Sequence, residues 1–371
     1  MADDDKHKKR IEEFSSLFRQ MQYEISKVMV GNTDVIEKVL VALFSGGHVL
    51  LESVPGLGKT SLVKALSRVL GLKFHRIQFT PDLMPADITG THLVVEDEQG
   101  KRKFEFNPGP VFANLLLADE INRATPKTQS AFLEAMAENQ VSVGGTTYQL
   151  ELPFFVMATQ NPIDMDGTYP LPEAQMDRFI FKLHLYYTDF EGEGEIIRRT
   201  TGGEIPEAKP VLEEKVASEK INSMKELVRE VLLSKEVEDH IVKLVYGTRP
   251  QRLMGRDAVT KIKTPEVTDK YVNFGASPRG TQSIVLASKV YALLDNRPHV
   301  CFADVDQVLF PSLCHRLMLN FEADVDNKEA YDVLEEIKEA VLSKSSFASR
   351  QVEKIQDKVG FFGRRKKKEE S

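Results

Sequence analysis

The stretch Ser53–Thr60, which reads Ser-Val-Pro-Gly-Leu-Gly-Lys-Thr, constrains the fold of this chain more than any other. It lies between a short apolar run, His48–Leu51, and a segment, Ser61–Leu70, whose apolar residues repeat at helical spacing. Such an apolar run is typical of a buried parallel strand, so the pattern predicts strand, loop and helix. Glycines let backbone N–H groups converge on phosphate oxygens, and the start of a helix favours an anion. The sequence therefore predicts a phosphate-binding loop.

The usual pattern of such a loop begins with glycine, and here Ser53 takes that position. Lys59 is expected to reach the β- and γ-phosphates of a nucleotide, and the Thr60 hydroxyl to ligate Mg²⁺. The alternative is a plain strand-to-helix turn with an exposed lysine. The predicted nucleotide-binding residues of this segment are Pro55, Gly56, Leu57, Gly58, Lys59, Thr60 and Ser61.

Alternating apolar runs and helical patterns continue along the first half of the chain, and this alternation indicates an α/β domain with a mostly parallel sheet. After about residue 190 the pattern changes to mostly helices, following a break marked by Glu191–Glu195 and Thr201–Pro210. Further buried strands are expected at 74–79, 114–118, 154–158 and 179–185. The expected division is a charged segment with the start of a helix at 1–20, a nucleotide-binding core at 21–190, a helical lid at 191–344 and a charged tail at 345–371.

Composition places the chain among ordinary globular proteins. It has 371 residues, of which 42% are hydrophobic and 28% charged. No run of 18 apolar residues and no apolar leader is visible, and Cys301 and Cys314 are too few for a disulfide framework or a metal cluster. These features predict a cytoplasmic protein.

The net charge of −7 argues against a dedicated nucleic-acid coat, which would be basic. One dense basic run, Arg364–Lys368, lies near the C-terminus. It is interpreted either as an electrostatic contact with a membrane surface or nucleic acid, or as a solvated tail. Membrane contact is expected only through this run, and nucleic acid is not an expected partner.

Two acids end an apolar run at Leu115–Glu120. At the carboxyl edge of a parallel sheet, Asp119 would lie beside the phosphate loop and hold Mg²⁺ through its water shell. Glu120 would polarise a water molecule for attack on the γ-phosphate. The alternative is a pair of solvated acids that cap a strand.

Three further residues are candidates for the reaction centre. Asn161, after the apolar run Phe154–Ala158, could sense the γ-phosphate or orient the attacking water, or it could be a turn residue before proline. Arg178, just before a strand, could project to the nucleotide of a neighbouring subunit, or form a surface ion pair. Arg279, at a helix start in the lid, could reach a γ-phosphate or face solvent.

The order of these elements resembles that of the AAA+ ATPases, and the local sequences resemble the MoxR family in particular. The resemblance spans roughly residues 20 to 320, and its motifs are Gly46–Glu52, Val54–Thr60, Gln78–Asp87, Asn107–Phe112, Ala118–Ala124, Ala158–Pro162, Tyr169–Phe179 and Ala276–Gly280. It implies a P-loop αβα core with a parallel sheet and a smaller helical lid. It also implies a homo-oligomeric ring, commonly a hexamer, with ATP and Mg²⁺ at the subunit interface.

By the same resemblance, Lys59, Thr60, Asp119, Glu120 and Asn161 act in the subunit that holds the ATP. Arg178 acts on a neighbour's ATP, and Arg279 is a second sensor that acts either in its own subunit or in the next. The segment Thr89–Phe106 resembles the helix-2 insertion. Gln140–Tyr148 alternates about a Gly-Gly turn and independently predicts a β-hairpin. In related motors such hairpins face the ring pore.

The resemblance implies a chaperone-like ATPase that remodels a protein client, together with partners that carry a von Willebrand factor A domain. The alternatives are a nucleic-acid-stimulated motor, a magnesium-chelatase-like subunit, and a scaffold that binds ATP without turnover. The segment Thr89–Phe106 has Lys101, Arg102 and Lys103 beside three acids. It offers no surface of basic and aromatic side chains for nucleic acid.

Overall fold

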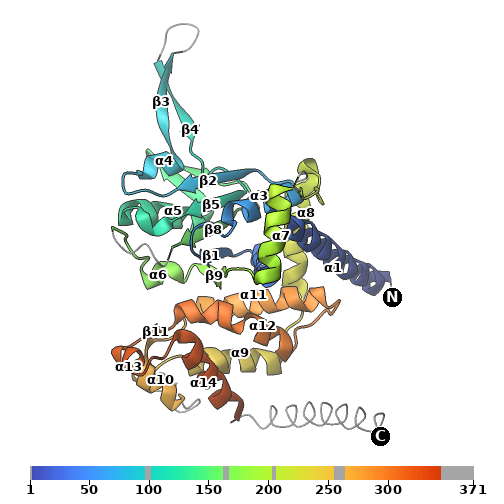
Figure 1. Ribbon diagram of the computed structural model, residues 1–371, viewed down its shortest axis with the longest axis vertical. Helices are drawn as coiled ribbons and strands as arrows, with labels where there is room; N and C mark the ends of the chain where they lie inside the picture. Colours follow the sequence, from blue (N-terminus) through green and yellow to red (C-terminus); the bar gives the residue numbers. More distant parts are fainter. Residues whose placement is uncertain (1, 97–101, 162–166, 203–205, 255–263, 344–371) are drawn as a thin grey trace. The chain divides into compact units, whose positions relative to one another are not determined.

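The computed structural model describes residues 2–96, 102–161, 167–202, 206–254 and 264–343 (Figure 1). The strands are β1 (His48–Glu52), β2 (Phe74–Gln78), β3 (Gly90–Glu96), β4 (Arg102–Pro108), β5 (Leu115–Asp119), β6 (Gln140–Val143), β7 (Thr146–Gln149), β8 (Phe155–Gln160), β9 (Phe179–His184), β10 (Val272–Phe274) and β11 (Met318–Leu319).

The α-helices of the described residues are α1 (Ala2–Val28), α2 (Thr33–Phe44), α3 (Lys59–Leu70), α4 (Pro85–Thr89), α5 (Pro126–Glu138), α6 (Glu173–Met176), α7 (Phe190–Thr201), α8 (Glu214–Glu230), α9 (Lys235–Gly247), α10 (Glu266–Tyr271), α11 (Pro278–Leu294), α12 (Phe302–Leu313), α13 (Phe321–Val325) and α14 (Ala330–Ser343). Short 3₁₀ turns lie at Ile121–Arg123, Gln251–Leu253 and Cys314–Arg316. None of these helices is both long enough and apolar enough to cross a bilayer.

The contacts between residues divide the chain into two compact units. The first is Met1–Val237 with Gln282–His315, and the second is Glu238–Thr281 with Arg316–Ser371. The domain boundaries expected after residues 20, 190 and 344 remain predictions. The charged tail with its basic run lies outside the described residues.

The first unit is built on a five-stranded sheet in the order β2-β5-β8-β1-β9 (Figure 1). All four neighbouring pairs are parallel, as the alternation of apolar runs and helices predicts. Every residue of β5 is buried, and β8 is buried up to Thr159. Because the strands are parallel, their carboxyl ends meet at one edge of the sheet, which is where α/β proteins bind ligands.

Helices cover both faces of this sheet. Every second residue of the neighbouring strands points to one face of the sheet. On that face Leu50, Leu116 and Val156 form one buried cluster with Phe132 and Leu133 of α5. Helix α2 contacts β1, helix α3 contacts β5, and α1 packs against α3. The predicted αβα arrangement is confirmed for this unit.

A helix occupies part of the segment that the sequence suggested was a break. The glycines at 192 and 194 and the closely spaced acids are unfavourable in a helix, yet α7 includes all of them. Asp189 caps it, because its carboxylate accepts a hydrogen bond from the Gly192 N–H at 2.8 Å. Glu195 pairs with Arg198 and Arg199 one turn later, and acids begin the helix while arginines end it. These local pairs and the helix dipole offset the poor propensity of glycine.

The second unit is mostly helical. It contains α10, α13 and α14, with a two-stranded antiparallel sheet of β10 and β11. Tyr271 Oη and Lys270 Nζ both contact Asp326 Oδ2 at 2.8 Å, and this joins α10 to the end of α13. The helical character predicted for the lid is confirmed here.

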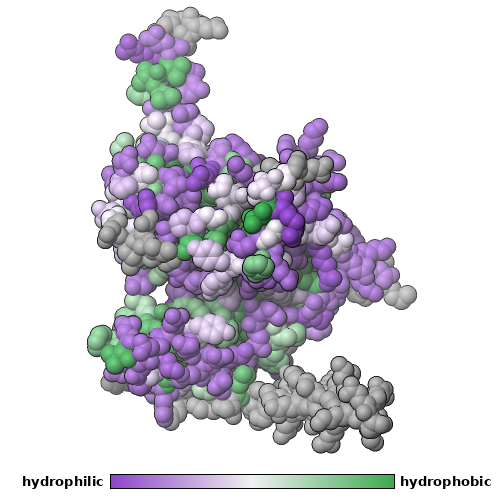
Figure 2. Space-filling view, in the orientation of Figure 1, coloured by the Kyte–Doolittle hydropathy of each residue, from purple (hydrophilic) through white to green (hydrophobic). Residues whose placement is uncertain are grey.

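Two β-hairpins extend from the first unit. Strands β3 and β4 form a long one that projects from the sheet in Figure 1. Strands β6 and β7 form a short one. The predicted Gly144-Gly145 turn of the short hairpin is confirmed, since both glycines have positive φ, 58° and 82°. Leu93, Val94, Val95 and Phe104 of the long hairpin are exposed, and Figure 2 shows apolar surface on this hairpin.

Candidate nucleotide site

The predicted phosphate loop connects the carboxyl end of β1 to the first residue of α3, Lys59. Gly56 has a φ of +90° and Gly58 a φ of +79°, values that L side chains rarely adopt. A Cβ built on Gly56 would meet no heavy atom within 4 Å, so this side of the loop is open. Gly58 is the N-cap of α3, and no side chain caps the helix there. The first N–H groups of α3 are therefore suited to an anion.

The strand register brings the other candidate residues to the same edge. Leu51 and Glu52 of β1 pair with Thr159 and Gln160 of β8, and Ala118 of β5 pairs with Ala158. Ser53 and Asn161 thus follow β1 and β8 at one level. Asp119 ends β5 on the same side of the sheet, level with Thr159. Strands are spaced about 4.8 Å apart, so β5 lies about 10 Å from β1, with β8 between them. Asn161 is 5% exposed and lies between the two strands that carry the loop and the acids.

The Asp119 carboxylate is buried, with its side chain 9% exposed, and each oxygen has a partner. Thr159 Oγ1 donates to Oδ1 at 2.6 Å, and Arg76 Nη2 donates to Oδ2 at 2.7 Å. The Thr159 hydroxyl also accepts a hydrogen bond from the Glu120 backbone N–H at 2.9 Å. One threonine of β8 therefore positions both acids of β5.

Glu120 lies at the point where the chain leaves β5. Its φ of 56° and ψ of 50° are left-handed, which is uncommon for a residue with a side chain. Its carboxylate Oε2 accepts from Gln78 Nε2 at 2.9 Å and pairs with Arg123 Nε at 3.0 Å. The acid predicted to act as a general base is thus held by two side chains of its own chain.

These residues fit magnesium bound together with a nucleotide. No cluster of three or more His, Cys, Asp or Glu side chains able to hold a metal lies among the described residues. Magnesium that arrives with a nucleotide needs only one or two protein ligands, because phosphates and water supply the rest. One buried carboxylate, Asp119, at the edge that carries the glycine loop meets that need.

Arg178 lies at the other edge of the sheet. Its neighbour Phe179 pairs with His48 at the amino end of β1, whereas the phosphate loop begins after Glu52 at the carboxyl end. The length of β1 separates the two, about 15 Å at 3.3 Å per residue. Arg178 Nη1 donates to Leu133 O at 3.0 Å, and its buried Nε has no hydrogen-bond partner among the residues that the structure describes.

Arg279 is the second residue of α11 and belongs to the second unit. Its backbone N–H donates to Ser277 Oγ at 3.0 Å. Its expected approach to a γ-phosphate remains a prediction.

The turn between α1 and α2 is a further candidate that the sequence reasoning did not single out. Met29 Sδ would lie 3.3 Å from a Cβ on Gly58, so this turn lies beside the phosphate loop. Asn32 Nδ2 donates to Tyr186 O at 3.2 Å, and a Cβ on Gly31 would meet Thr188 Cγ2 at 2.7 Å. The signal for it in the sequence is Val30-Gly31-Asn32, a glycine and an asparagine between two helical patterns.

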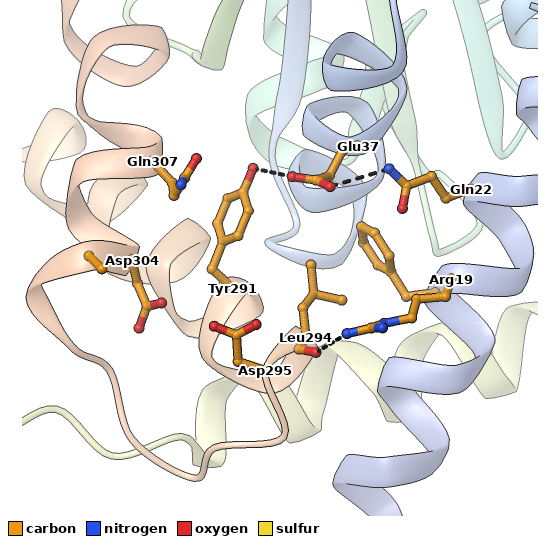
Figure 3. Close-up of a pocket in the computed structure, with 10 residues that line it drawn as sticks. Arg19, Gln22, Glu37, Tyr291, Leu294, Asp295, Asp304 and Gln307 are labelled. Carbon is orange, nitrogen blue, oxygen red and sulfur yellow. Dashed lines mark hydrogen bonds between the residues drawn. The ribbon is translucent and has the colours of Figure 1, made fainter. Parts of the chain in front are cut away.

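A pocket of about 400 Å³ lies elsewhere in the first unit, between α1, α2, α11 and α12 (Figure 3). Glu37 accepts hydrogen bonds there from Tyr291 Oη at 2.9 Å and from Gln22 Nε2 at 3.2 Å, and Arg19 donates to Leu294 O. Three of its lining residues are acidic, Glu37, Asp295 and Asp304, and no glycine loop lines it, so the pocket does not suit phosphate.

The αβα core, the glycine loop and the paired acids define a P-loop ATPase, and two family matches narrow the class. Residues 48–181 match the ATPase family associated with various cellular activities (AAA), and residues 265–337 match the AAA lid domain. Chaperone MoxR1 of Mycobacterium tuberculosis is 44% identical over 304 residues, which are 82% of this chain and 76% of that protein. The chain belongs to the MoxR family of AAA+ ATPases and is an ATP-hydrolysing enzyme.

Other relatives agree over most of their length. Protein YeaC of Bacillus subtilis, uncharacterized, is 41% identical over 89% of this chain and 96% of its own. A crystal structure of a candidate ATPase from Cytophaga hutchinsonii has a TM-score of 0.79 and 37% identity, and covers 91% of this chain and 98% of its own. These likenesses confirm the predicted fold, a parallel α/β core followed by a helical lid.

Proposed function

We propose that this ATPase couples hydrolysis to the chaperone-like remodelling of a protein client, as a ring in which neighbouring subunits share each active site. The observation that carries the proposal is the placement of Arg178. The residue predicted to neutralise charge on ATP lies at the opposite sheet edge from the phosphate loop of its own chain. A second subunit that presents this edge to the loop gives Arg178 a nucleotide to act on.

Within one subunit, the loop Pro55–Ser61 and the start of α3 hold the phosphates of ATP. Lys59 neutralises the β- and γ-phosphates, and Asn161 orients the attacking water. Glu120 accepts a proton from that water. Thr60 and Asp119 hold Mg²⁺, which supplies positive charge for the phosphate oxygens. The turn Met29–Asn32 lies beside Gly58, which supports a role for this segment in contact with the bound nucleotide.

The hairpins favour a protein client over nucleic acid. On the long hairpin, Arg102 pairs with Glu96 at 3.3 Å and Lys103 pairs with Glu105 at 3.4 Å, so its described cations are neutralised by neighbouring acids. Between these pairs Phe104 is 77% exposed, opposite Val94. Exposed apolar side chains on a hairpin suit an unfolded polypeptide better than a phosphate backbone.

The name of the mycobacterial relative, Chaperone MoxR1, supports the client role. The family resemblance supports three finer parts of the proposal: a hexameric ring in the cytoplasm, a partner with a von Willebrand factor A domain, and Arg279 as a second sensor.

The shared site is tested by ATP turnover per subunit across a range of protein concentrations, for wild type and Arg178→Ala. Turnover that rises with concentration in wild type and is at least about 100-fold lower in the variant supports the shared site. Turnover that is independent of both concentration and Arg178 overturns it in favour of a monomeric nucleotide switch.

The client role is tested with a permanently unfolded protein, reduced and carboxymethylated α-lactalbumin. It is expected to stimulate ATP turnover by wild type and to lose that effect on Phe104→Ser. The matched control is Phe321→Ser, because Phe321 is 78% exposed but lies outside the hairpins. Equal stimulation of all three proteins contradicts a client contact at the hairpin.

A further inference from the structure

The strand β2 places two polar side chains against the acids of β5. Arg76 and Gln78 alternate with the buried Ile77, so both side chains leave the same face of the strand. Gln78 pairs in register with Asp119, and Arg76 with Leu117. Neither residue belongs to the phosphate loop or to the general base, yet both contact the carboxylates at the reaction centre.

The Arg76 Nη2 atom donates hydrogen bonds to two acceptors. It donates to Asp119 Oδ2 at 2.7 Å and to Gln78 Oε1 at 2.7 Å. Gln78 in turn donates through Nε2 to Glu120 Oε2 at 2.9 Å. A single cation therefore contacts the magnesium-binding acid directly and the general base through one amide.

A buried carboxylate needs a positive partner when it is ionised, since desolvation is costly for an unpaired charge. Asp119 has one in Arg76, whose side chain remains 45% exposed and so has room to move into solvent. A magnesium ion with its water shell would neutralise the same carboxylate. The guanidinium and the ion would therefore compete for Asp119.

We propose that Arg76 is a stand-in for magnesium: it neutralises Asp119 while the site holds no nucleotide, and it releases that carboxylate when Mg²⁺ binds with the nucleotide. The inference rests on the proposed role of Asp119.

The test is the ratio of two dissociation constants for a fluorescent ADP analogue, one in EDTA and one in excess Mg²⁺. This ratio measures how much the metal adds to binding. In Arg76→Ala the competitor is gone, and the ratio is expected to rise about 2- to 5-fold, the worth of a half-exposed ion pair. Arg76→Lys, which keeps a point charge, should fall between the two. A ratio that falls, as for a residue that positions Asp119, or that stays unchanged overturns the proposal.

Arg68→Ala is the matched control. Arg68 is 50% exposed and pairs with Glu207 at 2.7 Å, a similar arginine exposure and the same distance as in the Arg76–Asp119 pair, but its acid is 66% exposed and lies outside β5. It should leave the ratio unchanged. Without nucleotide or metal, Arg76→Ala should also lower the melting temperature by about 2 °C, because Asp119 loses its cation. An unchanged melting temperature contradicts the neutralising role.

Asp119→Asn distinguishes the role of Asp119 in holding magnesium from the role of Arg76. If Asp119 holds magnesium, this variant brings the ratio down toward one. If the ratio survives in Asp119→Asn, the assignment of Asp119 fails and the proposal fails with it. A low ratio in Asp119→Asn with no change in Arg76→Ala overturns only the role of Arg76.

Discussion

Phe106 and Tyr148 stack with their ring centroids 3.8 Å apart and their planes inclined by 13°. The first lies on β4 and the second on β7, so the pair joins the two hairpins. His92 of β3 adds to it, since its Nε2 lies 3.1 Å from Tyr148 Oη. The two elements proposed to contact a client are therefore held together near the base of the long hairpin.

Phe106→Ala should uncouple the hairpins, because an aromatic pair contributes about 0.5–1.5 kcal/mol beyond its buried area. We expect faster amide hydrogen exchange in both β3–β4 and β6–β7. The control is Phe104→Ala, a change of the same kind at a residue that is 77% exposed on the same hairpin. If β6–β7 exchanges at the wild-type rate in Phe106→Ala, the stack does not couple the hairpins.

Thr159→Val should impair both acids of β5 while it preserves the shape of the side chain. Thr159 is fully buried, and valine would leave Asp119 Oδ1 and the Glu120 N–H without their shared partner. Leaving such groups unsatisfied costs about 1–3 kcal/mol, so we expect a lower midpoint of urea unfolding and at least a tenfold loss of kcat. Thr159→Ser keeps the hydroxyl and should retain most of both. A serine variant as impaired as the valine variant would point to packing instead.

His48 should make the folded protein acid-sensitive. Its Nδ1 accepts from the Val156 N–H at 3.1 Å and its Nε2 donates to Met136 O at 3.0 Å, so the neutral ring joins β1, β8 and α5. Burial lowers the pKa of His48 from its ordinary 6.5 to about 4. The unfolded chain takes up a proton below about pH 6.5 while the folded chain does not, so stability falls as the pH drops toward 4.

Between pH 7 and pH 5 this linkage amounts to about 2 kcal/mol. The measurement is the difference in the free energy of urea unfolding between the two pH values, for wild type and His48→Gln. The variant lacks the titrating group, so its difference should be smaller by that amount, whatever its absolute stability. Equal differences in the two proteins would show that His48 is protonated in the folded state.

The fold and the phosphate loop could be predicted because their signals are local. The run His48–Leu51 and the glycines of the loop predict a strand and a turn from local sequence alone, and the five strands of the sheet overlap the five predicted segments. The helix α7 was missed for the same reason, since its two glycines and its acids indicate a break when they are read alone. Its cap and ion pairs depend on which side chains meet.

The contacts of Arg76, Gln78 and Thr159 could not be predicted from the sequence. They depend on strand order, because β2 and β8 flank β5 although they lie far from it along the chain. The sequence shows that strands are present but not which of them are neighbours. The turn Met29–Asn32 was missed similarly, since only the fold brings it beside Gly58.

The central claim is that one subunit's Arg178 serves the nucleotide of the next, and mixing two inactive variants tests it most directly. Arg178→Ala keeps its own site but lacks the arginine, and Glu120→Gln keeps the arginine but lacks the general base. In a mixed ring, a Glu120→Gln subunit supplies Arg178 to the intact site of an Arg178→Ala neighbour. We predict ATP turnover in the mixture well above the sum of the two variants alone, with a maximum near equal amounts. A mixture no more active than that sum would contradict the shared site.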